Sequence, residues 1–111
     1  MFRNKKGKST IVRFDSLRRI EDIHKLSKLL NKKLRKHHKV RLLELMKEHV
    51  KEIEGLFRNG NKHYLTETGD LIILCFEMLL ENKQSINETL LKCFKRYEKK
   101  LPKLIKESHR C

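Results

Sequence analysis

The sequence has 111 residues, which is enough for one domain and too few for two. Hydrophobic residues make up 38% and charged residues another 38%, so the chain can form a core while it keeps a highly charged surface. Its four glycines and one proline are too few for the turns of a strand-rich fold, and its net charge of +14 indicates affinity for polyanions.

The sequence also lacks the features of membrane and secreted proteins. The longest apolar run, residues 71–76, is far shorter than the roughly 20 residues that span a bilayer. The first eight residues are too basic for the apolar part of a signal peptide. The three cysteines are odd in number and show no C-x-x-C spacing, which argues against a disulfide scaffold. We therefore expect a cytoplasmic protein without a membrane anchor.

The positive charge is concentrated near the N-terminus. Residues 1–41 hold fifteen Lys and Arg against three acids, whereas residues 42–111 hold thirteen against eleven. Two interpretations stay open for this region: it contacts nucleic acid or another polyanion, or it is a solvated basic helix with a loose tail. Residues 1–14 are expected to form a flexible basic segment.

Two amphipathic helices are predicted in the first half of the chain. Asp15 or Ser16 can cap the first helix, in which apolar residues recur every three or four positions as far as Leu34. A second helix is predicted from Val40 to Phe57. Its apolar seam consists of Leu43, Met46, Val50, Ile53 and Phe57.

Two further helices are predicted in the second half. Residues 62–82 are apolar almost all round, which is typical of a helix in the middle of a bundle. A fourth helix is predicted to start at Ser85, because Ser85 and Glu88 form an S-x-x-E capping box. Pro102 is expected to end or kink this helix, and residues 103–111 are expected to form a basic C-terminal tail, with a short helix as an open alternative.

These elements predict an all-α fold, a small antiparallel bundle of about four helices over residues 15–102. A bundle this small, with so apolar a central helix, leaves apolar surface that another subunit can cover. We therefore expect the bundle to be completed by oligomerisation, with a homodimer as the simplest case.

The candidate functional residues are carboxylates on the second and third predicted helices. Glu48 and Glu52 are spaced i, i+4, and Glu67 and Asp70 are spaced i, i+3, so each pair lies on one helix face. On the third helix these acids begin the one polar stripe, which must face solvent or cations. Two such pairs suit a hard divalent cation, whereas the simpler alternatives are pairing with lysines and a preference of acids for helix N-termini.

The region around these acids resembles the core of the MazG-type nucleoside triphosphate pyrophosphohydrolases. The family pattern is E-E-x-x-E, a spacer, and then E-x-x-D. Glu48 and Glu52 match the outer positions of the first half. The second half is matched by Glu67-Thr68-Gly69-Asp70-Leu71, and the family's basic-aromatic run is similar to Arg96-Tyr97-Glu98-Lys99-Lys100. The resemblance covers about residues 40–102 and leaves out the basic N-terminal region.

The resemblance implies a metal site and an activity. Mg²⁺, or Mn²⁺ in its place, would be held by Glu48, Glu52, Glu67 and Asp70 and would bind the phosphates of a nucleotide. An activated water would release pyrophosphate from a nucleoside triphosphate and leave the monophosphate. The phosphate oxygens would be contacted by Arg96, Lys99 and Lys100. Family members assemble as dimers or tetramers, so a homodimer or a homotetramer is implied.

The chain departs from the family pattern at His49, which stands where the family has the second glutamate of the first pair. His49 is a substitute ligand, a hydrogen-bond partner of a neighbouring glutamate, or a residue without a role. With one carboxylate fewer than the family, the site binds metal weakly or takes another substrate, or the chain is a degenerate member that no longer catalyses. Most of the other histidines are expected at the surface. The alternative function is a non-catalytic basic helical module that binds nucleic acid or an acidic protein partner.

Overall fold

The computed structural model describes the backbone of residues 14–108 and the side chains of residues 16–108. Four helices make up this part of the chain: α1 (Phe14–Lys33), α2 (His38–Arg58), α3 (Tyr64–Glu81) and α4 (Ile86–Ser108). No strand occurs among these residues, so the predicted all-α class is confirmed. Within the same range, no helix combines the length and the apolar character that a membrane span requires. The predicted flexible segment 1–14 lies outside the described residues, apart from its last residue, which begins α1.

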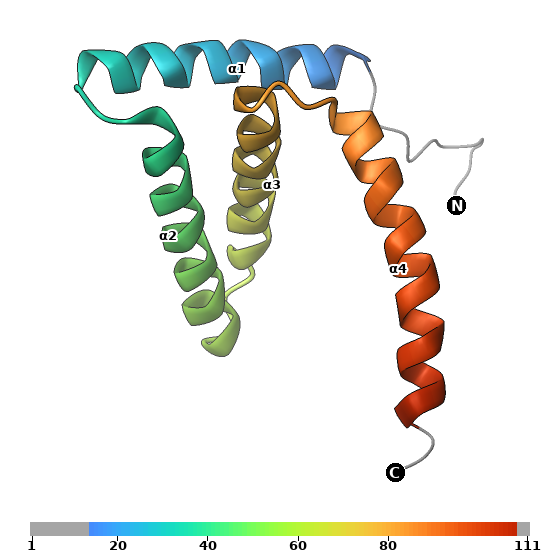
Figure 1. Ribbon diagram of the computed structural model, residues 1–111. Helices are drawn as coiled ribbons and strands as arrows, with labels where there is room; N and C mark the ends of the chain where they lie inside the picture. The colour runs from blue at the N-terminus through green and yellow to red at the C-terminus, as the bar shows by residue number, and fades with distance from the viewer. Residues whose placement is uncertain (1–13, 109–111) are drawn as a thin grey trace.

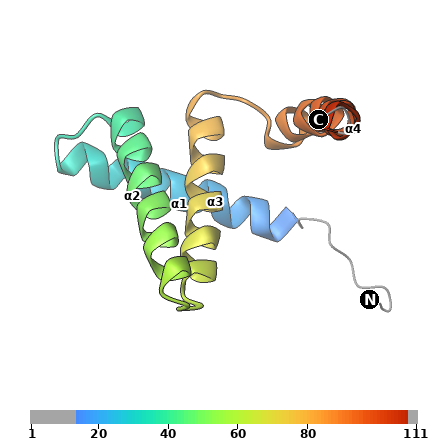
Figure 2. The same ribbon diagram turned by 90° about the horizontal axis from the view of Figure 1, so that it is seen from below.

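The four helices form a small bundle whose centre is the hairpin of α2 and α3. These two helices lie side by side and run antiparallel, while α1 crosses the end of the hairpin where α2 starts and α3 stops (Figure 1). After a short connection α4 extends away from the hairpin, and it also stands apart from α2 and α3 when seen from below (Figure 2). The radius of gyration of 17.5 Å accordingly exceeds the roughly 13 Å expected of a compact chain of this length.

Local sequence signals determine where the helices begin and end. The ring of His37 accepts a hydrogen bond from the backbone N–H of Val40 and so caps α2. The hydroxyl of Ser85 accepts the N–H of Glu88 at 3.1 Å, which confirms the predicted cap before α4. In the turn between α2 and α3, Gly60 has a φ of +71°, which glycine adopts without strain. The ends of α2 and α3 lie within two residues of the predicted ones.

The last helix does not end at Pro102. It contains this proline and continues to Ser108, so residues 103–108 of the predicted tail are helical. Proline removes a single N–H donor, and the carbonyl that loses its partner lies on an exposed helix where water can bond to it. One face of α4 exposes a continuous apolar stripe of Leu91, Phe94, Tyr97, Leu101, Leu104 and Ile105.

The interior contains a small apolar core and a polar network. The buried hydrophobic residues in the described part of the chain are Leu42, which is 1% exposed, and Leu74 and Ile86, which are each 8% exposed. Three polar residues are equally buried, namely His24, Asn31 and Glu77. The hydrophobic core of one chain is therefore modest, and polar contacts between helices contribute to the fold.

Candidate functional site

The antiparallel arrangement of α2 and α3 brings acids and a histidine together in the half of the hairpin nearer its turn. His49 offers a ring nitrogen and Glu52 and Glu67 each offer a carboxylate oxygen, and these three atoms lie within 4.8 Å of one another. Asp70 adjoins them, with its Oδ2 3.8 Å from Nε2 of His49. We call these four residues the His49 group. Each helix contributes two residues spaced i, i+3, which places each pair on one helix face.

His49 is oriented by its own helix. Its Nδ1 donates to the carbonyl oxygen of Leu45 at 2.9 Å, so Nε2 faces the acids and lies 3.4 Å from Oε1 of Glu67. The second carboxylate oxygen of Glu67 is 3.3 Å from Nε2 of His63. Glu67 therefore lies between two imidazole rings, each of which can carry a positive charge.

The His49 group is open to solvent on one side. The side chains of Glu67 and His49 are 15% and 20% exposed, whereas that of Asp70 is 51% exposed. A surface cavity of about 420 Å³ adjoins the group and is lined by Glu52, Gly55, Leu56, Asn59, His63 and Glu67. No atom lies within 4 Å of the position that a Cβ of Gly55 would occupy, so a small ligand has room there.

Glu48 lies outside the His49 group. Its Oε2 is 3.5 Å from Nη1 of Arg41, which also pairs with Glu44, and its side chain is 59% exposed. The structure thus gives Glu48 an ion pair on its own helix, with an arginine in place of the lysines that the sequence analysis considers. The other three predicted carboxylates, those of Glu52, Glu67 and Asp70, lie around His49.

The basic run on α4 is separated from the His49 group within one chain. Arg96 and Lys100 lie against the ring of Tyr97, 5.4 and 5.9 Å from its centre. Lys99 is exposed on the same helix, and none of the three basic residues lines the cavity beside the His49 group. Both views show α4 apart from α2 (Figures 1 and 2). The basic run can therefore serve this site only from another copy of the chain or after a movement of α4.

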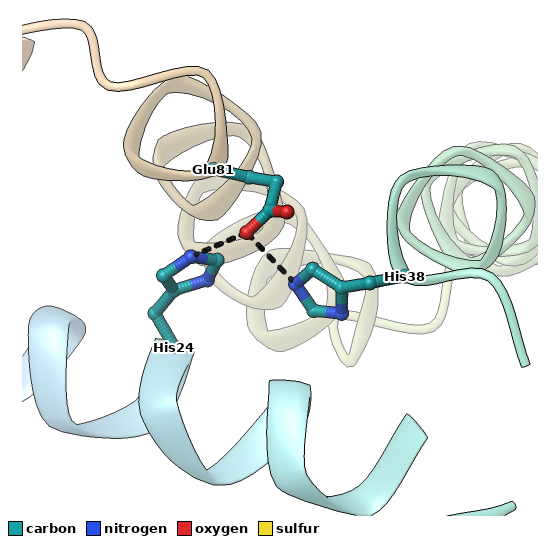
Figure 3. A group of neighbouring side chains, drawn as sticks. All are labelled: His24, His38 and Glu81. Atoms are coloured by element: carbon teal, nitrogen blue, oxygen red, sulfur yellow. Dashed lines mark ion pairs between the residues drawn. The ribbon is translucent and has the colours of Figure 1, made fainter. Parts of the chain in front are cut away.

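A second group meets where α1 crosses the hairpin. His24 on α1, His38 at the start of α2 and Glu81 at the end of α3 point toward one another (Figure 3). Burial lowers the pKa of His38 below its ordinary value. Burial would raise the pKa of Glu81, but the Lys28 ammonium and the two imidazoles hold it below its ordinary value.

The sequence gives no direct sign of this second group. The prediction that most histidines lie at the surface is wrong for His24, which is 8% exposed, and the side chain of His38 is only 11% exposed. The available signal is the spacing of Glu77 and Glu81, which continue the acidic stripe of an otherwise apolar helix. Nothing in the sequence indicates that His24, 53 residues before Glu77, lies against that stripe.

Comparison of the chain with protein-family models, with curated proteins and with solved structures found no match. The resemblance to the MazG-type enzymes therefore rests on the acids of α2 and α3 and the basic run of α4 alone.

Proposed function

We propose that this protein is a metal-dependent hydrolase that converts a nucleoside triphosphate to the monophosphate and pyrophosphate at the His49 group. The observation that carries the proposal is the convergence of three carboxylates and one imidazole from α2 and α3 beside an open cavity. Carboxylates gathered so closely repel one another unless a cation lies among them. Nucleotide phosphates are commonly bound together with a divalent cation that carboxylates hold.

The donor atoms of the His49 group fit a divalent cation. Because Nδ1 of His49 donates to Leu45, a neutral ring presents the lone pair of Nε2 to Glu67 and Asp70. Two acceptors that face each other are unfavourable, and either a cation between them or a proton on Nε2 removes the conflict. Three carboxylates suit Mg²⁺ or Mn²⁺, and the imidazole nitrogen favours Mn²⁺ of the two.

The residues around the cavity can divide the chemical work. A bound metal would neutralise phosphate charge and acidify a water molecule. Asp70, half exposed at the edge of the group, can accept a proton from a water that enters from solvent. Asn59 and His63 line the cavity and can donate N–H groups to phosphate oxygens. Attack of the water on the α-phosphorus breaks its bond to the bridging oxygen, and pyrophosphate leaves.

The test of this proposal is release of pyrophosphate from a panel of ribo- and deoxyribonucleoside triphosphates with millimolar Mn²⁺ or Mg²⁺. We expect activity on at least one of them, and we expect Glu67→Gln to lower both the rate and the Mn²⁺ affinity at least about tenfold, because a charged ligand becomes neutral. Glu54→Gln is the matched control, since Glu54 lies on α2 and pairs with Arg58 at 2.8 Å on the surface. Identical rates for the two variants, or no release from any nucleotide, would rule out this enzyme.

Self-association is the second part of the proposal, and a second copy of the chain is the partner. The apolar stripe of α4 is uncovered, and the hairpin carries an apolar hollow of about 410 Å³ lined by Met46, Lys47, Val50, Leu71 and Cys75. If α4 of one copy docks on the hairpin of another, both apolar surfaces are covered.

This assembly predicts a dimer or larger species in size-exclusion chromatography with light scattering. Leu101→Asp places a charge on the apolar stripe and should convert the protein to a monomer with unchanged helix content. Lys103→Asp, which changes α4 on the opposite face, should leave the assembly intact. A monomeric unmodified protein at micromolar concentration would contradict this part of the proposal.

A basic binding module is the second candidate function, because the charge on α1 is exposed. The exposed basic residues of this helix are Arg18, Arg19, Lys25, Lys28, Lys32 and Lys33. Their spread around the helix suits contacts with phosphates more than reading of bases. DNA or RNA binding that weakens steeply with salt, and that persists in Glu67→Gln, would identify this function.

A further inference from the structure

We propose that His24, His38 and Glu81 form a second metal site, of the kind that binds Zn²⁺, which fastens α1 to the ends of α2 and α3. This site is separate from the His49 group, and the inference does not depend on the function proposed above.

The three donor atoms come from three helices and have the spacing of metal ligands. Nε2 of His24 and Nε2 of His38 lie 3.2 and 3.9 Å from Oε1 of Glu81 (Figure 3). In a tetrahedral zinc site with bonds of about 2.1 Å, ligand atoms are about 3.4 Å apart. Small side-chain shifts are therefore enough to form the site.

In both rings Nδ1, the nitrogen on the side away from Glu81, already has a buried polar partner. Nδ1 of His24 is 3.3 Å from Oε1 of Glu77, which also accepts a hydrogen bond from the hydroxyl of Ser27. Nδ1 of His38 is 2.8 Å from the amide nitrogen Nδ2 of Asn31, and a half-turn of this amide about its Cβ–Cγ bond presents the oxygen to a ring N–H instead. Glu77 and Asn31 are 3% and 5% exposed. Metal-binding histidines are oriented in this way, with one nitrogen held by a carboxylate or carbonyl and the other aimed at the ion.

Two of the atoms that face the centre of the group, Nε2 of His38 and Oε1 of Glu81, are buried and lack hydrogen bonds to the part of the chain that the structure describes. Nε2 of His38 has no hydrogen-bond partner among the described residues, and Oε1 of Glu81 has ion-pair contacts but no hydrogen bond. If Nδ1 of each ring donates to its partner outside the group, the Nε2 lone pairs of both rings face a carboxylate oxygen of Glu81. Three acceptors that face one another raise the free energy of the folded chain where water is excluded. The ammonium of Lys28 lies 3.4 Å from Glu81 on a side chain that is 53% exposed. It can therefore swing into solvent when another cation occupies the centre.

The donor set selects the class of metal. Two imidazoles and one carboxylate suit a transition metal such as Zn²⁺ and do not suit Mg²⁺, which prefers oxygen ligands. The three residues leave a fourth position to water. The competing explanation is a protonated His24 held between Glu77 and Glu81, which requires no metal and predicts no metal binding.

The first experiment uses Co²⁺ as a spectroscopic probe. Full-length protein carrying Glu67→Gln, which weakens the His49 group, is stripped with a chelator and titrated with Co²⁺ and then with Zn²⁺. We expect one equivalent of Co²⁺ to give the visible absorption bands of a four- or five-coordinate site, and Zn²⁺ to abolish them. Zn²⁺ at 100 times its Kd should raise Tm by at least about 5 °C, because it binds the folded chain.

Two variants decide whether these residues are the ligands. His38→Gln should lose the Co²⁺ bands and weaken Zn²⁺ binding at least about tenfold. His37→Asn is the matched control, because it removes the neighbouring histidine while asparagine can still cap α2. Glu81→Gln keeps the side-chain size and repeats the test if His38→Gln does not fold. Equal Co²⁺ spectra in the ligand and control variants, or no Co²⁺ bands in the folded parent, would overturn the site and leave an ion-pair network around His24.

Discussion

Replacement of Leu42 by alanine should lower the free energy of unfolding by about 3–5 kcal/mol, the upper part of the range for buried leucines. Leu42 is 1% exposed and is the one fully buried large side chain among the described residues. Truncation removes its contacts and leaves a cavity between packed helices. Total stabilities of small domains are about 5–15 kcal/mol, so the variant should be close to unfolded at 37 °C. Urea denaturation followed by circular dichroism measures the loss.

The neighbouring residue provides the control for Leu42. Leu43 is also on α2 but is 47% exposed, so Leu43→Ala should cost less than about 1 kcal/mol. Leu42→Met keeps most of the volume and should cost less than about 1.5 kcal/mol. Similar losses for the two alanine variants would show that the interior is not packed around Leu42.

Glu77→Ala should destabilise the protein by about 3 kcal/mol in the absence of metal. Glu77 is 3% exposed, and its carboxylate is the partner of both Nδ1 of His24 and the hydroxyl of Ser27. Its removal leaves a buried imidazole and a hydroxyl without their partner, and such losses cost about 3–5 kcal/mol when a buried ion pair is broken. Denaturation in urea with a chelator present gives the value.

A second substitution at the same position separates shape from hydrogen bonding. Glu77→Gln keeps the volume and a carbonyl oxygen that can accept from His24 or Ser27, so it should cost only about 1 kcal/mol. If both Glu77 variants are as stable as the parent protein, the network at the crossing of α1 does not contribute to the fold.

The helices could be predicted from sequence because their signals are local. The apolar repeat of α2, the nearly continuous apolar run of α3 and the cap at Ser85 each depend on residues within one or two turns. The continuation of α4 past Pro102 is harder to predict, since the outcome depends on whether the carbonyl that loses its partner is exposed to water. The position of α1 across the hairpin depends on contacts between distant residues, which periodicity does not reveal.

The candidate sites show the same division between local and distant information. The sequence places Glu67 and Asp70 on one face, and the antiparallel hairpin brings Glu52 to Glu67. Glu48 shares a stripe with Glu52, but a rotation of α2 of a few tens of degrees decides which of them faces α3. That rotation is set by packing, and it presents His49 instead. The buried partners of His24 could not be predicted, because they lie on another helix far along the chain.

The distance between Glu67 and Glu81 determines how strongly a charge at one end of α3 affects the other end. They are fourteen residues apart, which corresponds to about 21 Å along the helix axis. This is more than twice the Debye length of about 8 Å at physiological ionic strength. Two unit charges at that distance interact by less than about 1 kcal/mol at an effective dielectric constant of about 20, so cation affinities at the two ends should be nearly independent, with α3 serving as a spacer.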